Sequence, residues 1–159
     1  MKILLVFILV SIFSFSKTNI PTTEHRAMKI IETLKDVYNI KTSKENIYQS
    51  ENSYEFDTDN SQIEKRISIS LVHGNVEVYT NPYLKDFEKY FNVCNAVLVS
   101  LLNVKTQNIP VLENNLMQIF KEVSNTSKSA TYTIKNTDIT IKPDSTGILG
   151  CEFYKKLTL

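Results

Sequence analysis

The chain has 159 residues and carries 18 lysine and arginine residues against 17 aspartate and glutamate residues. A nearly neutral chain without a Lys/Arg cluster lacks the positive potential that nucleic acids and anionic membrane surfaces attract, so we expect neither as a partner. The length fits one domain that is large enough to bury its own core.

The first 16 residues have the pattern of a secretory signal peptide. Lys2 precedes an apolar run, 3–15, that is too short for a membrane span of about 20 residues. The triplet Ser14-Phe15-Ser16 is typical of a cleavage site. We therefore predict a signal peptide over 1–16 and one exported domain over 17–159, periplasmic or extracellular, with no stable membrane span after cleavage. An uncleaved anchor is the alternative.

The first predicted elements are one helix and three strands. Apolar residues recur at three- and four-residue steps over 22–39, which predicts an amphipathic helix (Ala27, Ile30, Ile31, Leu34, Val37 and Tyr38). Strand-like segments follow at about 48–56, 65–72 and 76–80. His73-Gly74-Asn75 predicts a tight hairpin between the last two, because glycine and asparagine tolerate a positive φ.

A central helix is predicted over 83–103. One stripe of this segment is apolar throughout, with Cys94 near its middle (Leu84, Phe87, Tyr90, Phe91, Cys94, Val97, Leu98, Leu101 and Leu102). Val93, Ala96 and Val99 extend the apolar surface beyond that stripe, and a helix that is apolar nearly all round is buried nearly all round.

The rest of the chain predicts a third helix and three more strands. Pro110 is suited to the first turn of a helix over 110–125. Strands are expected at 131–135, 139–142 and 148–156, with turns at 136–138 and 143–147. The order α-βββ-αα-βββ predicts an α+β fold, in which an antiparallel sheet packs on the buried central helix.

Two cysteines remain after removal of the leader, Cys94 in the central helix and Cys151 in the last strand. An even number of cysteines in an oxidising compartment is normally paired, so we predict one structural disulfide. A buried pair of free thiols, or a metal or redox role, is the alternative. No nearby histidine completes a set of metal ligands.

Residues that could support catalysis are few. The two histidines, His25 and His73, have no partners at the spacing of a metal site or a catalytic triad. Within the acidic segment 51–64, Asp57-x-Asp59-x-Ser61 is similar to the start of a calcium loop. Gln62 and Ser68, however, occupy the positions where glycine and glutamate are required. We expect no catalytic residue, no cofactor and no metal site. A small secreted hydrolase that uses the carboxylates of this segment is the rival hypothesis (Glu51, Glu55, Asp57, Asp59 and Glu64).

The leading hypothesis is a non-enzymatic, exported domain that binds another protein, of the inhibitor or immunity type. Its candidate recognition surface is a sheet face that carries Tyr48, Tyr54 and Tyr79. A carrier of a small apolar ligand, with a cavity beside Val97 or Leu101, is a further alternative. Asn125 begins a glycosylation sequon, which matters only in a eukaryotic source.

Overall fold

The computed structural model describes residues 22–42, 47–50, 53–58, 67–72, 75–80, 86–143 and 149–155. These residues form three α-helices, one short 3-10 helix and seven strands. The helices are α1 (Thr23–Tyr38), α2 (Phe87–Leu102), η2 (Thr106–Asn108) and α3 (Ile109–Thr126). The strands are β1 (Tyr48–Gln49), β2 (Ser53–Asp57), β3 (Ile67–Val72), β4 (Asn75–Thr80), β5 (Ala130–Ile134), β6 (Thr137–Pro143) and β7 (Leu149–Lys155).

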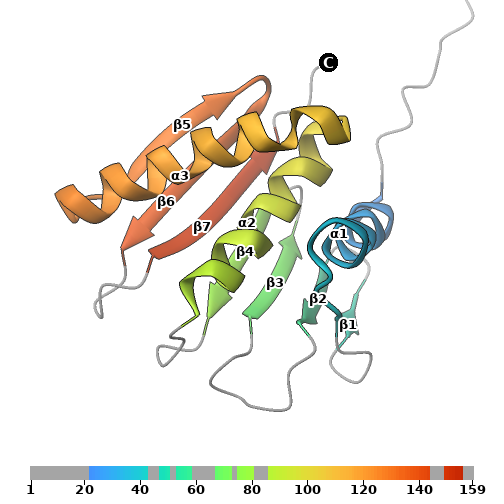
Figure 1. Ribbon diagram of the computed structural model, residues 1–159. Coiled ribbons are helices and arrows are strands. Elements are labelled where there is room, and N and C mark those ends of the chain that lie inside the picture. The colour runs from blue at the N-terminus through green and yellow to red at the C-terminus, as the bar shows by residue number, and fades with distance from the viewer. Residues whose placement is uncertain are drawn as a thin grey trace, which may run out of the picture.

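The seven strands form a single sheet in the order β1-β2-β3-β4-β7-β6-β5, and every neighbouring pair is antiparallel. Figure 1 shows α1, α2 and α3 together on one face of this sheet. The predicted α+β class, the single domain and the antiparallel sheet on a central helix are confirmed. The C-terminal hairpin β6–β7 completes the sheet by pairing β7 with β4, so both halves of the chain share one core.

The helix ends follow local capping chemistry. The Thr22 hydroxyl accepts a hydrogen bond from the backbone N–H of His25 at 3.2 Å, and Asn39 ends α1 with φ 52°. Asp86 accepts a hydrogen bond from the N–H of Lys89 at 2.9 Å. α2 therefore begins at Phe87 rather than at residue 83, because the Asp86 carboxylate caps it there. Residues 81–85 lie outside the described part of the chain.

The first predicted strand is two strands. β1 and β2 pair with each other, with Tyr48 opposite Glu55 and Gln49 opposite Tyr54. The N–H of Ser50 donates to the carbonyl of Ser53 at 2.9 Å, so the chain reverses inside the segment that we predicted to be continuous. The first block of the chain therefore contains four strands instead of three.

The turn before β6 lies one residue earlier than predicted. Ile134 pairs directly with Thr137, so Lys135 and Asn136 form the turn, and Lys135 has φ 54°. Thr137 is fully buried at the start of β6, which its polar character did not suggest. The predicted hairpin between β3 and β4 is confirmed by the pairing of Val72 with Asn75; residues 73–74 themselves lie outside the described residues.

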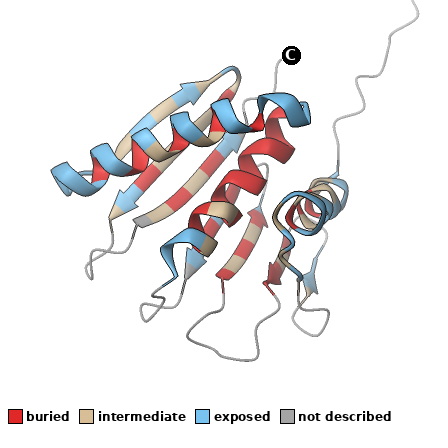
Figure 2. Ribbon diagram, viewed as in Figure 1, coloured by how far each residue is buried: buried red, intermediate tan, exposed pale blue. Residues whose placement is uncertain are grey.

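The core lies between the helices and the sheet. Twelve of the 16 residues of α2 are buried, which confirms that it is the central helix (Figure 2). The strands present alternate apolar side chains to the helices, among them Phe56, Ile69, Ile141 and Phe153. None of the helices in the described part of the chain is long and apolar enough to cross a membrane.

α2 is attached to β7 by two bonds at one position. The predicted disulfide is present between Cys94 and Cys151, whose Cα atoms are 6.4 Å apart, and both residues are fully buried. The backbone N–H of Cys151 also donates to the Tyr90 hydroxyl at 2.8 Å, and that hydroxyl donates to the carbonyl of Val78 at 3.1 Å. Val78 and Cys151 are paired across β4 and β7, so Tyr90 completes the backbone hydrogen bonding there.

Candidate recognition surface

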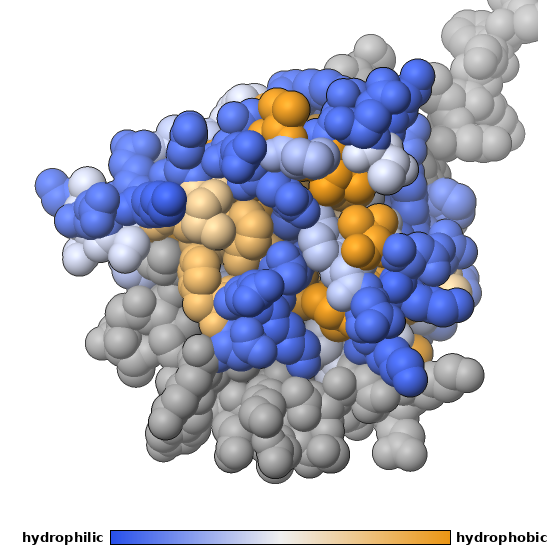
Figure 3. Space-filling view, in the orientation of Figure 1, coloured by the Kyte–Doolittle hydropathy of each residue, from blue (hydrophilic) through white to orange (hydrophobic). Residues whose placement is uncertain are grey.

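The sheet has one covered face and one open face. All three helices lie on the covered face (Figure 1), where they form the surface that Figure 3 shows as mostly hydrophilic with apolar patches between the helices. Side chains alternate between the two faces along each strand. The second set of side chains therefore points away from the helices, and we call the surface that they form the open face.

The strand register places seven open-face residues in one row across the whole sheet. Each residue is the cross-strand partner of the next, and we call this set the central row: Tyr48, Glu55, Ser70, Glu77, Glu152, Thr140 and Thr131. Cβ atoms of directly opposite residues in antiparallel strands are about 5 Å apart. Three glutamates thus lie in one line across the middle of the open face.

Two further rows flank the central row. On one side the partners run from β2 to β5 as Ser53, Val72, Asn75, Tyr154, Asp138 and Thr133. On the other side Asp57, Ser68 and Tyr79 are consecutive partners, and Lys142 lies opposite Gly150. Successive rows on one face are about 7 Å apart, two residues along a strand. The open face is therefore a continuous surface of carboxylates, hydroxyls and aromatic rings.

Two of the three predicted recognition tyrosines lie on the open face. Tyr48 is 67% exposed and Tyr79 is 43% exposed. Tyr54 lies on the opposite side of β2, where it is 6% exposed and its ring packs edge-on against Phe56 at 6.0 Å between centroids. Because the chain reverses before Ser53, Tyr54 lies opposite Gln49 and does not share the face of Tyr48. Its side chain points toward the helices and belongs to the core.

The open face also exposes two apolar residues that the sequence analysis missed. Tyr154 is 48% exposed and Val72 is 42% exposed. They lie in the same flanking row on either side of Asn75. Only the strand order β3-β4-β7 brings them together. The alternation of apolar and polar side chains along β7 was the signal available in the sequence. That alternation does not predict which strand lies beside β7.

The acidic side chains of β2 are held by hydroxyl groups. Tyr79 donates a hydrogen bond to Glu55, and Ser68 donates one to Asp57. Burial, the hydrogen bond to Glu55 and the negative charges of Glu55 and Asp57 all raise the pKa of Tyr79 above its ordinary range. Its hydroxyl therefore keeps its proton, and remains a donor to Glu55, further into the alkaline range than an ordinary tyrosine does.

Negative charge dominates the open face. Its described side chains include one ammonium group, that of Lys142, and five carboxylates (Glu55, Asp57, Glu77, Asp138 and Glu152). Lys142 forms an ion pair with Glu152. The described side chains of the face thus carry a net charge of about −4, in a chain whose total is +1.

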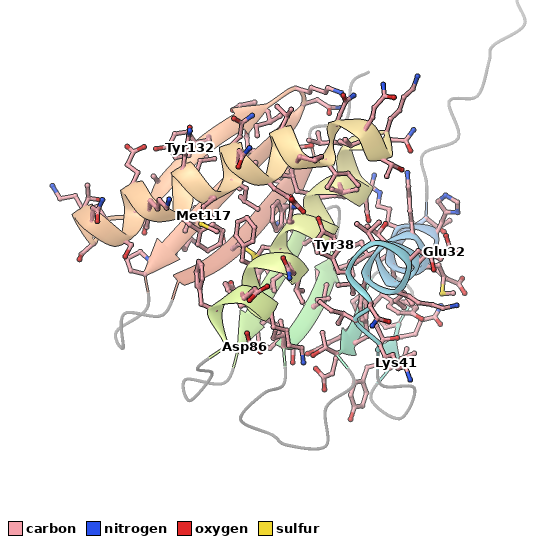
Figure 4. All side chains as sticks on the ribbon, viewed as in Figure 1. Glu32, Tyr38, Lys41, Asp86, Met117 and Tyr132 are labelled. Carbon is pink, nitrogen blue, oxygen red and sulfur yellow. A yellow bond between two sulfur atoms is a disulfide. The ribbon has the colours of Figure 1, made fainter. Side chains whose placement is uncertain are left out.

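The structure describes part of what the rival hypotheses require. Glu55 and Asp57 lie two residues apart along β2 on the open face, while Glu51, Asp59 and Glu64 lie outside the described residues. One surface hollow of about 490 Å³ lies between the end of α1 and the start of α2, where Lys41 and Asp86 are found (Figure 4). Another, of about 440 Å³, lies near the start of α1. Neither hollow is lined by Val97 or Leu101, which are buried in the core.

The remaining candidate residues are scattered. His25 is exposed in the first turn of α1, and His73 lies outside the described residues. Asn125 is exposed near the end of α3. No group of three or more His, Cys, Asp or Glu side chains that could hold a metal ion occurs in the described ranges.

Comparisons with protein-family models, curated proteins and solved structures find no match to this chain. A functional proposal must therefore come from the molecule itself. The open face combines exposed aromatic rings with a net negative charge, and it is the surface on which the following proposal depends.

Proposed function

We propose that the protein is an exported, non-enzymatic domain that binds another protein through the open face of its sheet. The observation that carries this proposal is the exposure of Tyr48, Val72, Tyr79 and Tyr154 on the sheet face that none of the described helices covers. Tyrosine is enriched at protein interfaces because its ring gives contact area while its hydroxyl remains hydrogen-bonded.

The shape of this face suits a protein partner better than a small molecule. Small-molecule sites are concave and bury most of the ligand, whereas an antiparallel sheet presents an extended surface. The sheet has seven strands, and neighbouring strands lie about 4.8 Å apart. With rows of side chains about 7 Å apart along the strands, the open face approaches the size that a protein interface covers.

Export is supported by the disulfide and by the leader. The bond between Cys94 and Cys151 is of a kind that persists in oxidising compartments and is rare where thiols are kept reduced. The apolar pattern of residues 1–16 supplies a route to such a compartment.

Site-specific photo-crosslinking tests this function. A benzophenone amino acid would replace Tyr48 or Tyr79 on the open face, or Val111 on α3 as a control that is 62% exposed on the helix layer. We expect the same protein to be captured from both open-face positions in the extracellular or periplasmic material of the source, and not from position 111. Equal capture at all three positions, or none at the open face in repeated trials, would contradict the proposal.

A further inference from the structure

We infer that the partner presents an arginine-bearing, basic protein surface to the open face, and that one of its cationic side chains binds Glu77. This inference rests on the proposed function and names the chemistry of the partner. It follows from the neighbours of Glu77, the occupation of the other carboxylates in the central row and the distribution of charge over the molecule.

Glu77 lies in the middle strand of the sheet, and neither of its two cross-strand neighbours is positively charged. Its cross-strand neighbours in the central row are Ser70 on β3 and Glu152 on β7. Like charges directly opposite one another destabilise an antiparallel pair. Glu77 is exposed and has no hydrogen bond or ion pair to the side chains described in this structure. A cation that bound there would remove a repulsion as well as form a bond.

The other two glutamates of the central row already have partners. Glu55 accepts the hydrogen bond from Tyr79. Glu152 is paired with Lys142, whose ammonium group reaches it from β6. With respect to the described side chains, Glu77 is therefore the carboxylate of the row that is left for a group from outside, with Glu152 beside it as a second acceptor.

Among the described residues, the excess of negative charge lies on the open face. Segments 22–42 and 86–129, which contain the helices and their connections, carry seven acidic and eight basic residues, so this side of the molecule is balanced. The open face carries five carboxylates against Lys142 alone among its described side chains. A basic partner is consequently attracted to one face and oriented before contact.

Arginine fits this surface better than lysine. A guanidinium group is planar, donates two parallel hydrogen bonds to carboxylates and stacks on aromatic rings. The open face offers both kinds of acceptor, with Glu77 in the central row and the exposed rings of Tyr79 and Tyr154 in the rows on either side.

The test uses a labelled hexa-arginine peptide as the probe, followed by fluorescence anisotropy and by amide shifts in the NMR spectrum of the mature chain. We expect Glu77→Lys to weaken binding by about tenfold or more, because a like charge then faces the peptide. Glu77→Gln should have a smaller effect. Glu32→Lys is the matched control, with the same change of charge on α1 in the helix layer (Figure 4), and should change binding by less than about twofold.

The amide shifts should map to Ser70, Glu77 and Glu152, and a hexa-glutamate peptide should cause none. Absence of hexa-arginine binding, shifts on the helix layer, or equal losses for Glu77→Lys and Glu32→Lys would overturn the inference. One outcome would contradict this inference but not the proposed function. If a benzophenone residue at position 79 still captures its partner with full yield in the Glu77→Lys variant, the face binds protein but not through a basic group. Failure of the crosslinking itself would remove both.

Discussion

Tyr90 shows how one side chain can complete a backbone network. Its hydroxyl accepts from the N–H of Cys151 and donates to the carbonyl of Val78, and its ring is buried under α2. A hydroxyl can do both because it is a donor and an acceptor at once. The sequence marks Tyr90 only as an apolar position of the central helix.

We expect Tyr90→Phe to lower the free energy of unfolding by about 1–3 kcal/mol, because two buried backbone groups lose a partner. Urea denaturation of the purified variant measures this change. Tyr154→Phe is the matched control: Tyr154 is exposed on the open face, and its replacement should change stability by less than about 0.5 kcal/mol. Equal stability of Tyr90→Phe and the parent would show that β4 and β7 pair without the hydroxyl.

Tyr38 forms a polar contact between three helices. Its hydroxyl donates a hydrogen bond to the Glu113 carboxylate on α3 at 2.9 Å. The same hydroxyl accepts one from the side-chain amide of Asn95 on α2 at 2.6 Å (Figure 4). Burial, followed by the hydrogen bond and negative charge of Glu113, raises the pKa of Tyr38. Asn95 is fully buried, and its carbonyl oxygen has no hydrogen-bond partner in the described structure.

This raised pKa predicts a loss of stability in alkali. In the unfolded chain a tyrosine ionises near pH 10, whereas folded Tyr38 keeps its proton. The folded state then binds more protons than the unfolded state, so the stabilisation that is present below pH 10 declines as the pH rises further. We expect Tyr38→Phe to have a shallower decline in unfolding free energy above pH 10 than the parent. The same slope in both proteins would show that Tyr38 titrates normally.

At the scale of the elements, α2 is stabilised by both burial and a covalent bond. The disulfide closes a loop with a sequence separation of 57, which removes roughly 4 kcal/mol of unfolded-chain entropy on the usual model. Leu98 on the same helix is fully buried, as predicted from the apolar stripe. The two contributions can be compared directly because both act through α2.

Replacement of Cys94 and Cys151 by Ser should lower the free energy of unfolding by about 2–4 kcal/mol and leave the chain folded. Leu98→Ala should cost about 2–5 kcal/mol through lost burial and the cavity that remains. One denaturant titration series, with circular dichroism to confirm the fold, measures both. A Leu98→Ala variant as stable as the parent would mean that its site in the core refills completely.

The pairing of β4 with β7 leads to a prediction of a gain in stability rather than a loss. Glu77→Lys replaces a like-charge cross-strand pair by an attractive one with Glu152, so we expect the isolated protein to gain about 0.2–1 kcal/mol. The gain should shrink at high salt because exposed charges are screened. Thermal unfolding at low and high ionic strength checks this. A less stable Glu77→Lys protein at low salt would indicate that Glu77 has a favourable partner in the folded chain.

At the scale of the whole molecule, the architecture is a two-layer domain with one face left open. The helices balance their own charges and cover the core, and the open face concentrates carboxylates and tyrosines. The buried disulfide and this asymmetry of charge are the two features on which the proposed recognition role in an oxidising compartment depends.

Intact-mass analysis of exported material tests the compartment that this architecture is proposed to occupy. We expect a chain that begins at Lys17, or within a few residues of it, and that contains no thiol reactive to alkylation before reduction. A full-length chain from the cytoplasm, with two free thiols, would contradict export and would remove one support of the proposed function.

The sequence by itself determined the class of the fold, the central helix and the disulfide. These features follow from local rules: the apolar period of a helix, the alternation of a strand, and the pairing of two cysteines in one chain. Errors occurred where polar residues have structural roles, as at Ser50, Lys135 and Thr137, because composition alone does not reveal how a chain reverses.

Only the tertiary structure decided which side chains share the open face. Tyr54 looked equivalent to Tyr48 and Tyr79 in the sequence, yet a reversal before Ser53 sets the facing of β2 and places its ring in the core. Glu77 and Glu152 are 75 residues apart, and nothing local predicts that they face each other. Strand order and register are long-range properties, because they depend on how separate hairpins meet over one core, and a shift of one residue would reverse every facing.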